Sequence, residues 1–262
     1  MYRFFVSPEN ICGNDIYIEG SDVNHIKNVL RMKTGEEVSV VAVTTSDTVD
    51  FSELDIQQVD NREYRCEIAD FEDDRVHLKL RFIKEDNVEL PCRIYLFQGL
   101  PKSDKMEFII QKAVELGVYE IIPVAMKRSV VKLDKKKEAA KVTRFNSIAE
   151  AAAKQSKRRI IPKVMQVMTF KEAVEYCRDV DVKLLPYELA DMEAMDKTRD
   201  ILADIKPGES VAVFIGPEGG FDEGEVDLAL KGDFDTITLG RRILRTETAG
   251  MTVLSWLVYL LE

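Results

Sequence analysis

From Arg93 onward, short apolar runs typical of buried strands alternate with segments whose apolar residues recur at helical spacing. This alternation constrains the fold more than any other feature of the sequence. It predicts strands over 93–98, 120–125, 163–167, 182–185, 211–215 and 236–239, and helices over 103–116, 138–155, 169–178, 190–205 and the apolar end of the chain. Such a pattern is typical of a mainly parallel sheet with helices on both faces. The predicted fold class of this region is therefore α/β.

Residues 1–72 follow a different pattern. Short strands are predicted over 2–6, 15–18, 37–43, 51–59 and 64–69, separated by turn signals such as Cys12-Gly13-Asn14. One helix is predicted over 21–30, with Ser21 or Asp22 as its N-cap. We therefore expect a small β-barrel domain over 1–72, a linker and edge strand over 73–90, and a second domain over 91–262.

Several classes of protein are disfavoured by composition. An apolar fraction of 45% with 32% charged residues indicates a soluble globular chain. The four cysteines form no CxxC pair, which favours a reducing cytoplasm over a disulfide or zinc protein. The start lacks a signal-peptide core, and the apolar stretch 251–261 is shorter than the roughly 20 residues that span a bilayer. Both histidines, His25 and His77, lie in the β-rich part, so neither a metal site nor a Ser–His–Asp triad is expected.

The charge distribution favours a polyanion as partner although the formal net charge is −10. Residues 127–163 contain thirteen basic and three acidic side chains. Clustered basic residues are the electrostatic footprint of a nucleic-acid surface. A solvated lysine-rich helix is the alternative interpretation of the same block.

Two glycine-containing loops, each following a predicted strand, form the candidate ligand site. They are Gly216-Pro217-Glu218-Gly219-Gly220-Phe221 and the segment from Gly240 to Ala249. Glycine lets backbone groups approach a small, flat ligand closely. Neither loop has a Walker A or GxGxxG pattern. Asp222 and Glu223 open the next helix, and acidic residues there disfavour phosphate.

Individual side chains of these loops have more than one interpretation. Glu218 can accept a hydrogen bond from a ligand or hold its own loop, and Thr246 or Thr248 can cap the last helix. That helix is apolar nearly all round, which predicts either a homodimer interface or a deeply buried helix.

These residues resemble the ribosomal RNA small-subunit methyltransferase E family. The resemblance rests on Gly216-Pro217-Glu218-Gly219-Gly220, on Leu239 to Ala249, and on the strand-to-helix element from Leu100-Pro101-Lys102 to Glu115-Leu116-Gly117. It extends to Arg128-Ser129, Gln155-Ser156…Arg158…Pro162, Arg3-Phe4-Phe5 and His25…Val29-Leu30-Arg31. One position departs from it, because Lys154 stands where many members carry glutamate.

The resemblance implies a fold, a cofactor and a substrate. The fold is a SPOUT-type α/β domain with a trefoil knot near 210–250, preceded by a PUA-like RNA-binding domain. Its members act as homodimers on N3 of a uridine in 16S rRNA, with S-adenosylmethionine as methyl donor. The implied cofactor site comprises Leu184, Leu185, Pro186, Glu188, Ile215, Gly216, Pro217, Glu218, Gly219, Leu239, Gly240, Ile243, Leu244, Arg245, Thr248 and Ala249.

The same resemblance implies contacts to RNA and a way to stabilise charge. The predicted RNA contacts are Arg3, His25, Arg31, Lys102, Lys105, Arg128, Lys154, Gln155 and Arg158. Arg245 or Arg128 would stabilise the uracil anion that forms when N3 loses its proton. A ribose 2′-O methyltransferase of the same class and a non-catalytic rRNA-binding assembly factor remain alternatives.

Overall fold

The computed structural model describes residues 1–42, 62–85, 88–102, 104–131, 135–187 and 193–262. The chain divides into two compact units. The first comprises Met1–Glu89 and Lys154–Ile161, and the second comprises Leu90–Ala153 and Pro162–Glu262. Lys154–Ile161 therefore joins the first unit, although the sequence pattern places it within the second.

A six-stranded sheet organises the first unit, in the order β1-β4-β5-β6-β3-β2. Its strands are β1 (Arg3–Val6), β2 (Ile11–Cys12), β3 (Asp15–Glu19), β4 (Glu37–Ala42), β5 (Arg62–Phe71) and β6 (Arg75–Glu85), and a 3-10 turn, η1 (Pro8–Asn10), precedes β2. Among these described strands, β1 and β4 pair in parallel and all other pairs are antiparallel. Burial alternates along β1 and β3, and the buried strand residues form one core that includes Phe4, Ile16, Ile18, Val38, Val40, Ile68 and Leu78.

Two predictions for this unit need correction. The expected edge strand is β6, which lies inside the sheet between β5 and β3. The expected helix over 21–30 is present as α1 (Ser21–Asn24) followed by the π-helical turn η2 (His25–Val29), but its N-cap is Gly20 at φ 71°. Glycine tolerates that left-handed backbone at the N-cap position, whereas a serine or an aspartate in its place would be strained. The strand predicted over 51–59 lies outside the described residues.

The second unit contains a parallel sheet, as predicted. The order along the sheet is β10-β8-β7-β12-β11-β13, with β9 paired to β8, and every one of these pairings is parallel. The strands are β7 (Arg93–Gly99), β8 (Glu120–Ala125), β9 (Lys163–Val164), β10 (Met168–Thr169), β11 (Val182–Pro186), β12 (Ser210–Ile215) and β13 (Asp235–Ile237). The helices are α2 (Lys105–Glu115), α3 (Lys135–Gln155), α4 (Phe170–Tyr176), α5 (Glu193–Ala203), α6 (Glu223–Lys231) and α7 (Thr246–Leu261).

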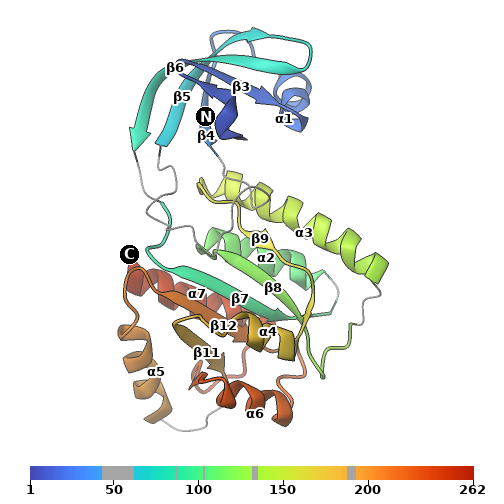
Figure 1. Cartoon of the computed structure of the whole chain (residues 1–262), viewed down its shortest axis with the longest axis vertical. Helices are drawn as coiled ribbons and strands as arrows, with labels where there is room; N and C mark the ends of the chain where they lie inside the picture. The colour runs from blue at the N-terminus through green and yellow to red at the C-terminus, as the bar shows by residue number, and fades with distance from the viewer. Residues whose placement is uncertain (43–61, 86–87, 103, 132–134, 188–192) are drawn as a thin grey trace. The chain divides into compact units, whose positions relative to one another are not determined.

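Helices cover both faces of this sheet (Figure 1). On β12, Ala212 and Phe214 enter a core shared with α4 and α6, where Phe214 stacks on Phe97 at 4.2 Å between ring centroids. The next residue, Ile215, faces the other way, toward Gly250 of α7. The strand is buried along its whole length, as the continuous apolar run predicts for a central parallel strand.

The cap of α2 shows how local chemistry sets an element boundary. Gly117, which follows the end of this helix, adopts φ +84°. Its N–H bonds the carbonyl of Val114, and the next N–H bonds that of Ala113, which is the Schellman arrangement. A Cβ at Gly117 would lie 2.6 Å from Leu90 Cδ1, so the Leu90 side chain would have to shift to make room for it. Among the described helices, none combines the length and apolar character needed to cross a membrane.

Candidate functional site

The carboxyl ends of the parallel strands bring the two predicted loops to one edge of the sheet. β11 lies between β12 and β13, with Leu184 opposite Val213 on one side and Pro186 opposite Ile237 on the other. The predicted cofactor residues of β11 are thus central in this group of strands. In open parallel sheets, ligands bind in crevices outside the carboxyl ends of the strands.

The first loop is packed so closely that glycine is required around it. A Cβ at Gly99, the last residue of β7, would lie 2.7 Å from both N and Cδ of Pro217. A Cβ at Gly219 would lie 2.9 Å from Cβ of Arg128. Separations this short do not occur between real side-chain and backbone atoms, so the loop's position depends on the absence of these side chains.

A buried hydroxyl joins the two loops. Thr246 Oγ1 donates to the Gly216 carbonyl at 2.7 Å and accepts from Gln98 Nε2 at 2.9 Å. This corrects the prediction that Thr246 or Thr248 caps α7, because the N-cap is Arg245 and no side chain bonds there. Sequence reasoning missed Gln98, which is fully buried in the structure. The signal for it in the sequence is a polar residue within an apolar strand.

Glu218 connects the first loop to the start of α2. Its carboxylate accepts from the Lys102 N–H at 3.2 Å and from Lys105 Nζ at 3.0 Å. Lys105 also lies 3.3 Å from Glu247, at the start of α7. These bonds hold the first loop against the start of α2, and the predicted cofactor contact of Glu218 stays a prediction.

Electrostatics agree with that role. Burial opposes the charge of Glu218, but backbone hydrogen bonds and Lys105 outweigh burial and lower the pKa of this carboxyl below its ordinary value. The hydrogen bond to Glu218 raises the pKa of Lys105. Both groups therefore stay charged near neutral pH, and Glu218 is a weak base.

The second loop is more open. Gly240 adopts φ +94°, and Ile243 is 86% exposed. Arg245 and Thr248 are exposed, whereas Leu239, Leu244 and Ala249 are partly buried. Glu188, the remaining predicted cofactor residue, lies outside the described residues.

The two arginines predicted to stabilise charge differ in their surroundings. Arg128 donates from Nη1 to the Gly219 carbonyl at 3.3 Å, so it lies against the first loop. Arg245 precedes α7, and no hydrogen bond or ion pair of its guanidinium involves the part of the chain that the structure describes.

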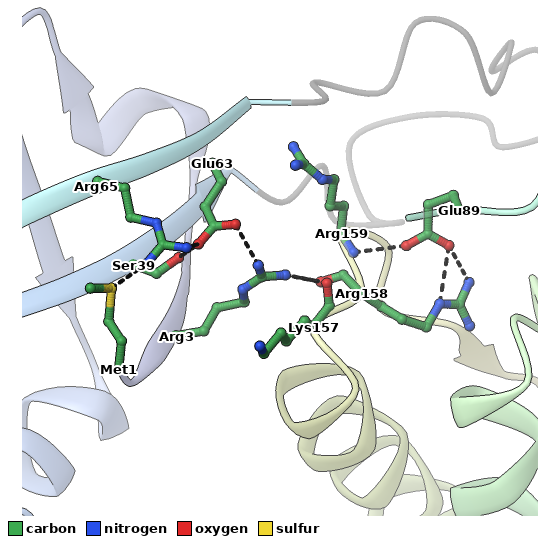
Figure 2. Close-up of polar contacts among 9 residues, drawn as sticks. All are labelled: Met1, Arg3, Ser39, Glu63, Arg65, Glu89, Lys157, Arg158 and Arg159. Atoms are coloured by element: carbon green, nitrogen blue, oxygen red, sulfur yellow. Dashed lines mark hydrogen bonds and ion pairs between the residues drawn. The ribbon is translucent and has the colours of Figure 1, made fainter. Parts of the chain in front are cut away.

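Three predicted RNA contacts are engaged in ion pairs within the first unit. Arg3 pairs with Glu63, Lys154 with Asp22, and the buried Arg158 with Glu89. Arg3 and the Arg158–Glu89 pair are drawn in Figure 2. His25, Arg31 and Gln155, also in this unit, are exposed, as is Lys102 in the second unit. For every residue named in this paragraph as a predicted RNA contact, binding to RNA stays a prediction.

A cavity of about 490 Å³ lies at the carboxyl ends of β7 and β8. It is lined by Leu100, Ala125, Met126, Lys127, Ser129, Val131, Glu138, Val167, Met168, Thr169 and Glu172. Its size suits a small ligand. None of the predicted cofactor residues lines it, so it neighbours the glycine loops without being formed by them.

Comparison with known proteins identifies both parts of the chain. The family model described as an RNA methyltransferase domain matches residues 88–258, and one described as an RNA methyltransferase PUA domain matches residues 18–41. A Bacillus subtilis protein named ribosomal RNA small subunit methyltransferase E is 37% identical over 94% of this chain and 90% of its own length. Its namesake from Mesomycoplasma hyopneumoniae is 33% identical over 97% of this chain and 98% of its own length.

Solved structures agree. The ribosomal RNA small subunit methyltransferase E of Neisseria gonorrhoeae, bound to S-adenosyl methionine, has a TM-score of 0.77 and 27% identity over 99% of this chain and 98% of its own. A putative methyltransferase of Legionella pneumophila, in complex with the same cofactor, has a TM-score of 0.77 and 30% identity over 98% and 96% of the two chains. With a family model matching most of its length and relatives similar from end to end, the chain belongs to the ribosomal RNA small subunit methyltransferase E family of RNA methyltransferases.

Proposed function

We propose that this protein transfers a methyl group from S-adenosylmethionine to N3 of a uridine in 16S rRNA of the small ribosomal subunit. The observation that carries the proposal is the buried Thr246 hydroxyl, which fixes both glycine loops at the edge of the sheet. The named relatives and the cofactor-bound structures of similar proteins support the substrate and the methyl donor.

The residues present fit this cofactor. Gly216 to Gly219 and the segment from Leu239 to Ala249 offer backbone groups and apolar side chains to an adenine ring, with Leu184 to Pro186 between them. The adjacent helix α6 follows its N-cap residue Asp222, whose carboxylate caps it together with Glu225. These acidic groups disfavour a phosphate-bearing nucleotide and are compatible with S-adenosylmethionine, which has no phosphate.

S-adenosylmethionine supplies an electrophilic methyl group. The protein must therefore allow uridine N3 to lose its proton and must stabilise the charge that remains on the base. When uridine N3 loses its proton, negative charge spreads over the uracil ring. Arg128, positioned against Gly219, and Arg245, at the start of α7, are the cations proposed to stabilise that charge. Glu218 is assigned to loop positioning, because its ion pair and lowered pKa make it a weak proton acceptor.

The remaining parts of the proposal concern assembly. The PUA-like unit would bind rRNA in the cytoplasm, and the chain near 210–250 would form the trefoil knot of this class. A homodimer is supported by α7, where Tyr259 is 84% and Leu260 46% exposed on a helix of high apolar content.

The decisive experiment is methylation of small subunits from a strain lacking the modification, followed by identification of the methylated nucleoside by mass spectrometry. N3-methyluridine is the expected product. A ribose-methylated nucleoside would instead support the 2′-O methyltransferase alternative. RNA binding without any calorimetric response to S-adenosylmethionine would support the assembly-factor alternative and end the enzyme proposal.

A further inference from the structure

The first unit contains a buried positive charge that has no hydrogen-bond partner among the described residues. Arg159 is 2% exposed and is among the largest fully buried side chains in the described chain. Its Nε, Nη1 and Nη2 atoms have no hydrogen-bond partner among the described residues. A guanidinium carries five N–H donors, and removing them from water without pairing them is costly. Such a group calls for a ligand or another explanation.

The turn that carries Arg159 is held in place from two sides. Glu89 accepts from the backbone N–H groups of Arg159 at 2.8 Å and of Ile160 at 3.2 Å, and it also pairs with the Arg158 side chain at 2.6 Å. Arg3 donates to the carbonyl of Lys157, whose backbone is held at φ +61°. A left-handed non-glycine residue is strained and persists only where its surroundings impose it. The arrangement therefore fixes where the Arg159 side chain goes.

The carboxylate that fixes the turn does not neutralise Arg159. In Figure 2 the Arg159 guanidinium points away from Glu89. The carboxylate oxygens of Glu89 accept hydrogen bonds from the Arg158 side chain and from backbone N–H groups. Glu63, the other carboxylate of the cluster, is also occupied: it pairs with Arg3 at 2.7 Å and with Arg65 at 2.8 Å, and accepts from the Ser39 hydroxyl.

The cluster as a whole carries excess positive charge. Four guanidinium groups, of Arg3, Arg65, Arg158 and Arg159, accompany the two carboxylates of Glu63 and Glu89. Arg65 Nε is a further buried donor that has no hydrogen-bond partner in the described part of the chain. Burial is the main cause that lowers the pKa of Arg3, and the neighbouring charge of Arg159 lowers it further. The positive groups therefore lie close enough to repel one another, as they do where an anion is bound.

We propose that the missing partner of Arg159 is a phosphate oxyanion, and that it is supplied by the backbone of the bound RNA. A guanidinium matches phosphate with two parallel N–H donors, which explains an arginine with its whole fork left unpaired. The choice of RNA as the source rests on the proposed function, whereas the anion site itself does not.

Thermal unfolding of the full-length protein tests the anion site. The wild type, Arg159→Met and Arg81→Met are compared in potassium phosphate and potassium chloride at equal ionic strength. Arg81 is an exposed arginine on β6 of the same unit, so its variant matches the loss of charge. In chloride, Arg159→Met should unfold at the same or a higher temperature than the wild type, because it removes an unpaired buried charge. Phosphate should raise the midpoint of the wild type and of Arg81→Met but not that of Arg159→Met.

Two outcomes would overturn the anion site. One is an Arg159→Met variant that unfolds well below the wild type in chloride, which would make Arg159 a structural anchor. The other is an unchanged response of this variant to phosphate. Should Arg159→Met not fold, Arg159→Lys serves instead, since it keeps the charge but loses the planar fork, and its phosphate response should be weaker than that of the wild type.

RNA binding distinguishes the two sources of phosphate. Fluorescence anisotropy with a single-stranded RNA is measured over a series of KCl concentrations. Arg159→Met should make the slope of log K against log salt less steep by about 0.7, the value for one phosphate contact to a single strand. Suppose that phosphate stabilises the wild type but not Arg159→Met, and that the two proteins have the same salt slope for RNA binding. The site would then bind free phosphate, and the RNA source would be overturned. Neither measurement needs methyl transfer, and calorimetry with S-adenosylmethionine reports separately on the proposed function.

Discussion

The hydroxyl of Thr246 lies 2.7 Å from the carbonyl oxygen of Gly216 and donates a hydrogen bond to it. This bond ties the first residue of α7 to the residue that follows β12. Gln98 of β7 donates to the same hydroxyl, so three elements far apart in sequence meet at one buried oxygen. Both predicted ligand loops therefore share one anchor, and disturbing it should affect the two loops together.

We expect Thr246→Val to lower both stability and cofactor affinity. Valine fills the same space but leaves the Gly216 carbonyl without its donor. An unsatisfied buried polar group costs about 1–3 kcal/mol, which urea unfolding should detect. Calorimetry with S-adenosylmethionine should show weaker binding, because the Gly216 loop is no longer held.

The controls for this variant separate the hydroxyl from the site. Thr246→Ser keeps the oxygen and should behave like the wild type. Thr252→Val removes a hydroxyl from the same helix whose hydrogen bond, within the described residues, goes to the Thr248 carbonyl, so cofactor binding should be unaffected. Normal cofactor affinity in Thr246→Val would show that the anchor does not position the loop.

Close approach of two backbones makes Gly99 a second sensitive position. A Cβ there would lie 2.7 Å from Pro217, so Gly99→Ala should displace the first loop at a cost of about 1–3 kcal/mol. Binding of S-adenosylmethionine should fall with it. Gly224→Ala is the matched control, because the nearest atom to its new Cβ is Asp222 Oδ1, at an ordinary 3.5 Å. Equal cofactor affinity of the two variants would contradict this assignment.

Part of this fold can be predicted from the sequence for clear physical reasons. The boundaries predicted for β8, Glu120 to Ala125, match the structure, because an apolar run between a helix-stopping glycine and a basic segment has few other conformations. The buried face of α2 follows helical spacing as well, since its buried residues are Met106, Ile109, Ile110, Ala113 and Val114. Local patterns of this kind need no tertiary information.

Other features depend on contacts that no local pattern encodes. No local pattern around Gln98 predicts its hydrogen bond to Thr246, which lies far along the chain. Helical periodicity runs through α3 to Gln155 and gives no sign that the following turn is bonded to Glu89 in the first unit. The predicted cap of α7 is wrong for a similar reason, since the Thr246 hydroxyl has a better-placed partner in another strand.

Lys105 provides a test that separates loop positioning from RNA contact. Its ammonium bridges Glu218 of the first loop and Glu247 of α7, at 3.0 and 3.3 Å. Lys105→Met should therefore weaken S-adenosylmethionine binding several-fold, even without RNA. Lys112→Met is the control, because Lys112 lies on the same helix and pairs only with Glu115 among the described residues. A variant that loses RNA affinity while keeping full cofactor affinity would instead assign Lys105 to RNA.

Glu120 should make stability depend on pH in a predictable direction. Burial raises the pKa of this carboxyl, and this outweighs the hydrogen bond from Tyr176 and the charge of Lys163. The folded state therefore binds the proton more tightly than the unfolded chain. The resulting stability is fully present below the unfolded pKa and is lost as pH rises through the raised folded pKa.

Glu120→Gln mimics the protonated carboxyl and keeps an oxygen that can accept from the Tyr176 hydroxyl, which lies 2.7 Å away in the wild type. In urea unfolding, this variant should match the wild type near pH 4 and be more stable than it at pH 7.5. Glu175→Gln, which removes an exposed carboxylate from α4, should show little difference between the two pH values. If Glu120→Gln is less stable than the wild type at pH 7.5, then the ionised carboxylate stabilises the fold and the sign argued here is wrong.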